Sequence, residues 1–120
     1  MRMHLRLLAA ALAAVLVLTV ASPAHAGTFT NNYSGKDSAK TTTLNYSASH
    51  KSFYLYVWVS GAPVNGNAFF TIKMYDKSST LVWSARDQAG RTYFIGSNVT
   101  KIVVSRYDTH ANVFNRWVRR

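Results

Sequence analysis

The chain has 120 residues, no cysteine and a formal net charge of +10, with 14 Lys and Arg against four Asp and no Glu. This length fits one small domain, and the missing cysteine excludes disulfides, thiol nucleophiles and cysteine metal sites. The charge excess attracts anionic partners through long-range attraction and counterion release, without specifying which anion.

Residues 1–26 have the pattern of a secretory signal peptide. A positive n-region with Arg2 and Arg6 precedes an apolar run at 7–21. The small residues of the expected cleavage site and the new N-terminus are Ala24, Ala26 and Gly27. The apolar run is shorter than the roughly 20 residues that a membrane helix needs, and no second run follows. The sequence therefore predicts an exported protein, secreted, extracellular or cell-wall associated, whose mature chain, 27–120, has no transmembrane span. The Ala- and Leu-rich run and the lack of cysteine favour a bacterial source.

The mature chain is predicted to fold as a single all-β domain. No stretch keeps a 3.6-residue apolar period, whereas short runs rich in β-branched and aromatic residues recur between Gly, Asn, Asp and Ser. The even spacing predicts a small antiparallel β-sandwich or a small barrel, and the sequence leaves both open. About eight short strands are expected, at 28–33, 41–47, 53–60, 68–75, 80–85, 91–95, 101–107 and 112–118.

Turn residues separate these strands, because Gly, Asn, Asp, Ser and Pro each favour a turn backbone or cap it. The predicted connections are 34–37, 61–67, 76–79 and 96–98, and 108–110 is expected to turn between the last two strands. Segments 28–34 and 41–47 share the pattern T-x-T-x-N-Y-S. We interpret them as two similar edge strands joined by a loop at Gly35.

Two aromatic strands suggest a binding surface. Side chains alternate across a strand, so one face of 53–59 is apolar and the other carries tyrosine and tryptophan. The strand at 68–75 alternates similarly, and pairing of the two strands would join their aromatic sides into one surface. Its rings would stack on sugar rings or nucleobases, and Lys73 would meet a phosphate or carboxylate. The candidate ligand-binding residues are Tyr54, Tyr56, Trp58, Phe69, Lys73 and Tyr75. Trp83 and Trp117 are candidates to extend this surface. The alternative is that these rings simply pack within the sheets.

The end of the chain is a second candidate, because arginine and tryptophan together suit an anionic polymer or membrane surface. The residues of this anionic-surface site are Lys101, Arg106, Arg116, Trp117, Arg119 and Arg120. The alternative is a frayed, solvated chain end.

Catalytic patterns are missing. The four Asp all lie beside turn residues, where a carboxylate caps the backbone. His50 and His110 follow the expected cleavage site, and a triad of His110, Asp108 and a serine lacks a nucleophile elbow. No metal-ligand spacing, phosphate loop or dinucleotide motif occurs, so no metal and no cofactor are predicted. The sequence predicts a protein that is not an enzyme.

The leading hypothesis is a secreted, non-enzymatic domain that binds an anionic or glycan polymer of the cell envelope. The alternative is a secreted antagonist, a bacteriocin-like toxin or a protein inhibitor, that acts on membranes or a protein target. No specific nucleic-acid recognition is expected. Fold class alone does not choose between these functions.

Overall fold

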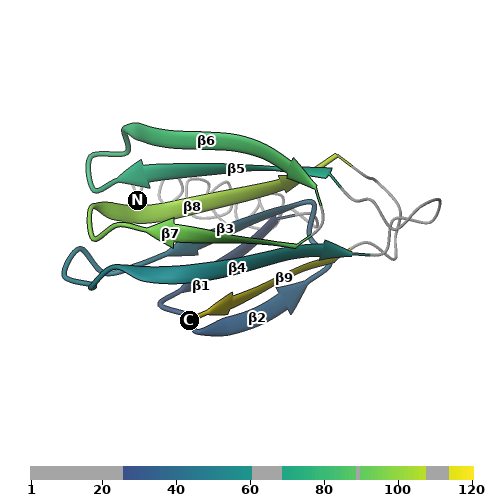
Figure 1. Ribbon diagram of the computed structural model, residues 1–120, viewed down its shortest axis with the longest axis horizontal. Coiled ribbons are helices and arrows are strands. Elements are labelled where there is room, and N and C mark those ends of the chain that lie inside the picture. The colour runs from purple at the N-terminus through teal and green to yellow at the C-terminus, as the bar shows by residue number, and fades with distance from the viewer. Residues whose placement is uncertain (1–25, 61–68, 89, 108–113) are drawn as a thin grey trace, which may run out of the picture.

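Two β-sheets stack face to face in the computed structural model, which describes residues 26–60, 69–88, 90–107 and 114–120 (Figure 1). The described residues form nine strands: β1 (Ala26–Thr30), β2 (Ser34–Asp37), β3 (Thr41–Asn45), β4 (Phe53–Ser60), β5 (Phe69–Asp76), β6 (Leu81–Gln88), β7 (Arg91–Ile95), β8 (Val99–Arg106) and β9 (Phe114–Arg119). The predicted β-sandwich is confirmed over the barrel, because the strands divide between two separate sheets.

One sheet has five strands in the order β1-β3-β8-β5-β6, and the other has four in the order β2-β9-β4-β7. All described pairs are antiparallel except β1 with β3, which run parallel. The chain crosses to the four-stranded sheet at β2 and returns at β3, so β3 lies beside β1 in the same direction. The prediction that segments 28–34 and 41–47 are both edge strands is therefore wrong, since β3 lies inside its sheet.

The segment 34–37, expected to be a turn, is strand β2. It pairs with β9, and Gly35 stands opposite Trp117. A Cβ at Gly35 would overlap the Trp117 ring, only 2.8 Å from its Cε2, so the glycine lets the strand backbone lie against the indole. Gly and Asp are poor strand formers, which explains why the sequence pattern failed here.

Three predicted features lie outside the described residues. They are most of the signal peptide, at 1–25, the connection at 61–67 and the turn at 108–110. Ala26, from the expected cleavage site, is the first residue of β1.

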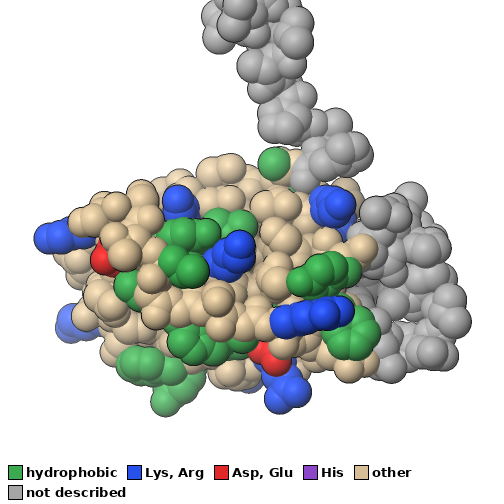
Figure 2. Space-filling view, turned by 90° about the horizontal axis from the view of Figure 1, so that it is seen from above, with side chains coloured by type: hydrophobic (Ala, Val, Ile, Leu, Met, Phe, Trp, Pro, Cys, Tyr) green, Lys and Arg blue, Asp and Glu red, His purple; other side chains and the backbone are tan. Residues whose placement is uncertain are grey.

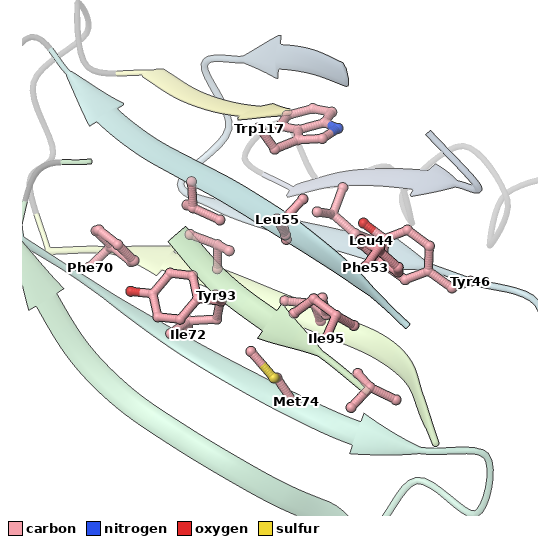
Figure 3. Close-up of a cluster of buried hydrophobic side chains, with 14 of the residues drawn as sticks. Leu44, Tyr46, Phe53, Leu55, Phe70, Ile72, Met74, Tyr93, Ile95 and Trp117 are labelled. Atoms are coloured by element: carbon pink, nitrogen blue, oxygen red, sulfur yellow. The ribbon is translucent and has the colours of Figure 1, made fainter. Parts of the chain in front are cut away.

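The core lies between the sheets and follows the predicted alternation. The side chains drawn in Figure 3 come from both sheets and point toward one another. Buried apolar side chains include Phe53, Leu55, Val57 and Val59 from β4, and Phe70, Ile72 and Met74 from β5. Since β4 and β5 belong to different sheets, their apolar sides meet across the sandwich.

The predicted turn at 76–79 is confirmed. The Asp76 carboxylate accepts hydrogen bonds from the backbone N–H groups of Ser78 and Thr80, at 2.9 and 3.0 Å. The aspartate therefore organises the hairpin between β5 and β6, as its position beside turn residues predicted. The predicted turn at 96–98 is likewise closed by a backbone hydrogen bond.

Candidate binding surface

The outer face of the four-stranded sheet brings cations and aromatic rings together. Lys36 on β2 stands opposite Arg116 on β9, and Arg116 stands opposite Trp58 on β4. Opposite residues of neighbouring strands share one face and lie about 5 Å apart. Lys36 and Arg116 are exposed, and Trp58 is half-buried. The three side chains form a row across three strands.

Further aromatic rings continue along β4 from this row. The Arg120 guanidinium lies over the Tyr56 ring, 5.1 Å from its centroid. Two backbone hydrogen bonds join Arg120 to Tyr54, and the Tyr54 ring meets the Phe94 ring edge-on at 5.6 Å. We call the whole set the basic-aromatic face: Lys36, Tyr54, Tyr56, Trp58, Phe94, Arg116 and Arg120.

A shallow groove of about 600 Å³ opens in this face. It is lined by Ser34, Gly35, Lys36, Trp58, Arg116 and Val118. The outward side chains of the sheet, as far as they are described, include the hydroxyls of Ser34 and Thr92 but no carboxylate and no amide. The groove can therefore stack a ring and pair with an anion.

The expected joint surface of β4 and β5 does not form. The two strands lie in different sheets, so their aromatic sides face opposite sides of the molecule. The assumption that they are neighbours was wrong, because alternation fixes which side chains share a face but not which strands pair. The candidates on the outer face of the five-stranded sheet are Phe69, Lys73 and Tyr75. There the Lys101 ammonium lies 4.6 Å from the centroid of the Tyr75 ring.

The expected basic tail is a strand inside the four-stranded sheet, between β2 and β4. A frayed chain end is therefore wrong for β9. Trp117 is only 2% exposed and packs on Phe29, with ring centroids 4.5 Å apart, so it is not part of a surface. Alternation turns Trp117 inward and leaves Arg116 outward.

Two arginines of the expected anionic-surface site also lie elsewhere. Arg106 is buried and donates a hydrogen bond to the Ser38 carbonyl. The Arg119 guanidinium lies 4.1 Å from the centroid of the Phe53 ring, with the Tyr46 ring also beside it. Arg119 faces inward because it stands on the same side of β9 as the buried Trp117, and it covers one end of the core.

The structure thus joins part of each predicted site. The aromatic residues of β4 share a face with Arg116 and Arg120, two sets that the sequence analysis treated separately. Sequence reasoning missed Lys36, placed in a turn, and Phe94, placed in a strand without a partner. The alternation of side chains along Arg91–Ile95 could have predicted that Phe94 is exposed, because it determines which side chains of β7 point outward.

Asp37 has a structural role. Its carboxylate accepts hydrogen bonds from the Thr42 hydroxyl and from the Ala39 N–H, at 2.9 to 3.0 Å. Burial raises the pKa of Asp37 more than these bonds and the nearby Arg106 charge lower it. The carboxyl is thus part of a polar cluster between the sheets.

Asp87 and Tyr93 connect the two sheets. The Tyr93 hydroxyl on β7 donates to the Asp87 carboxylate on β6, and burial together with this bond raises the pKa of Tyr93. Arg91 adds an ion pair to Asp87 at 3.8 Å. With Asp76 capping its hairpin, all three aspartates of the described residues make internal contacts.

His50 is engaged by the backbone. Its Nδ1 lies 2.8 Å from the Lys51 carbonyl, and its Nε2 lies 2.5 Å from the Val99 carbonyl. In the described ranges, no three His, Cys, Asp or Glu side chains gather as a metal site. His110 and Asp108 lie outside those ranges.

The edge strands β6 and β7 bound a second, more apolar groove of about 470 Å³. Val82 and Trp83 line it from β6, and the Trp83 ring packs edge-on against Tyr93. Trp83 therefore lies in a different groove from Trp58, although Phe94 of the basic-aromatic face also lines the groove of Trp83. Figure 2, seen from the side where β6 lies in Figure 1, shows hydrophobic and basic side chains close together with little acidic surface.

No protein-family model matches the chain, and no curated protein matches its sequence. Among solved structures, it is similar to the pre-peptidase C-terminal domain of collagenase from Bacillus anthracis. The match has a TM-score of 0.50 and 12% identity, and it covers 82% of this chain and 98% of that domain. This likeness supports the β-sandwich fold alone.

The described part of the chain contains no helix with the length and apolarity needed to cross a membrane.

Proposed function

We propose that this chain is an exported, non-enzymatic domain that binds an anionic or glycan polymer of the cell envelope through the basic-aromatic face. The row of Lys36, Arg116 and Trp58 carries the proposal, because it combines two exposed cations with an aromatic ring beside a groove. Arginine pairs with phosphate or carboxylate groups, while an aromatic ring stacks on the flat side of a ligand.

Two further observations support the proposal. The described aspartates and His50 make internal contacts, which favours binding over catalysis. The signal-peptide pattern of residues 1–26 favours export. A free, membrane-active basic tail would favour the antagonist alternative, whereas β9 pairs with strands on both sides, so we do not propose that alternative.

Sedimentation with insoluble cell-wall polymer tests the proposal, with the protein incubated across a range of salt concentrations. We expect the captured fraction of the protein to fall as salt rises but not to disappear. The captured fraction should be smaller for Trp58→Ala than for the wild-type protein. Trp83→Ala is the matched control, since Trp83 lines a different groove from Trp58. The absence of capture, or equal loss in both folded variants, would contradict the proposal.

A further inference from the structure

The basic-aromatic face has two columns that run along neighbouring strands. Its three rings on β4 stand at alternate residues, so their Cα atoms are spaced by about 7 Å, twice the rise per strand residue. Arg116 and Arg120 follow β9 beside them, and Lys36 adds a cation next to Arg116. A line of rings beside a line of cations suits a linear ligand with the same two features.

From this arrangement we infer that the face binds single-stranded polynucleotide without sequence preference. The inference rests on the face of the proposed function and adds a ligand beyond the envelope polymer. A single strand carries an anionic backbone and a planar ring in every unit. Proteins that bind such strands combine aromatic stacking platforms with a positive groove that follows the backbone. Stacking is sequence-tolerant because every base has a π-face.

The chemistry of the face favours this ligand over a neutral glycan. Carboxylate and amide side chains are the groups best equipped to hold sugar hydroxyls by several hydrogen bonds. The described outward side chains of this sheet include neither group, and its three cations would have no counterpart on a neutral sugar. Tyr54 is 55% exposed, so its ring is open to a ligand.

The groove also favours a chain over a flat membrane. Lys36 and Arg116 line the same groove as Trp58, whose side chain is half-buried. A planar lipid surface would meet the rim of this groove first, whereas a narrow strand can enter it. Arg120, stacked over Tyr56, adds a guanidinium plane on which a base can also stack.

Fluorescence anisotropy with two labelled oligomers tests the inference on the whole chain. One probe is oligothymidylate, and the other is an abasic deoxyribose-phosphate oligomer of the same length, which keeps the charge and removes the rings. We expect tighter binding of oligothymidylate. Trp58→Ala should weaken that binding roughly 5- to 100-fold and leave the abasic probe unaffected, while Trp83→Ala changes neither.

The cations give a second readout. Each phosphate contact contributes about −0.7 to the slope of log K against log salt for single strands. The double variant Lys36→Ala, Arg116→Ala should therefore make this slope less steep by about 1.4 for both probes.

Tyr54→Ala replaces Trp58→Ala if the latter fails to fold. Equal affinity for the two probes, or oligothymidylate binding unchanged in the folded ring variant, would overturn the inference. Capture by wall polymer without oligonucleotide binding would overturn it and leave the proposed function standing.

Discussion

Trp58 and Arg116 stand directly opposite each other on β4 and β9, and their side chains share the outer face of the four-stranded sheet. The strands β5 to β8 lie between these two strands in the sequence, yet β4 and β9 are neighbours. The ring and the cation therefore meet only through long-range strand pairing. The binding face thus depends on the buried contacts that hold the sandwich together.

Gly35→Ala should destabilise the domain by about 1–3 kcal/mol, because overpacking a core forces side chains or backbone to shift. The new Cβ would overlap the ring of the buried Trp117. Gly96→Ala is the matched control, since its Cβ would meet only the exposed Asn98 side chain. Chemical denaturation measures both variants, and equal stability of the two would show that the close approach of β2 to the indole is wrong.

Tyr93→Phe should lower the free energy of unfolding by about 1–2 kcal/mol, because a hydrogen bond to a carboxylate is lost. The hydroxyl donates to Asp87 on the opposite sheet. Tyr54→Phe removes an exposed hydroxyl and serves as the control in the same denaturation experiment. If the two variants are equally stable, the hydrogen bond between Tyr93 and Asp87 does not contribute to the free energy of unfolding.

Tyr46→Phe should leave stability unchanged or raise it by up to about 1 kcal/mol at neutral pH, since it removes a buried polar group. The Tyr46 hydroxyl has no hydrogen-bond partner among the described residues, and burial raises its pKa from 10.0 to about 12. The unfolded tyrosine ionises first, so the wild-type protein loses stability as the pH rises from 10.0 toward about 12. Thermal unfolding across this range should show a smaller loss of stability in the variant. A clear loss of stability of Tyr46→Phe at neutral pH would contradict the finding that this hydroxyl has no hydrogen-bond partner among the described residues.

Because of Asp37, the free energy of unfolding should fall as the pH rises above 3.8. Burial raises its pKa in the folded state, so the folded chain holds this proton more tightly than the unfolded chain. The resulting stabilisation is complete below pH 3.8 and is lost as the pH rises through the folded pKa. Asp37→Asn should flatten this part of the profile measured by thermal unfolding, with Asp76→Asn as the control. An unchanged profile in Asp37→Asn would refute this assignment.

Local alternation predicted the core well, because a period of two fixes which side chains face inward. Leu55 and Ile72 lie in the core where that pattern places them. The binding surface could not be predicted in the same way, since alternation says nothing about which strands are neighbours. Alternation places Trp117 and Arg116 on opposite faces of β9. Only the insertion of β9 between β2 and β4 brings Arg116 opposite Trp58.

Binding should depend on one face rather than on total charge, and two double variants of equal charge test this most directly. Lys36→Ala with Arg116→Ala alters the basic-aromatic face, whereas Lys73→Ala with Lys101→Ala alters the outer face of the five-stranded sheet. The measurement is the salt-dependent affinity of the whole chain for immobilised polyphosphate. We predict that the first pair weakens binding by about tenfold or more and reduces the salt slope, while the second has little effect. Equal losses in the two pairs would contradict the account, because they would mean that net charge alone determines binding.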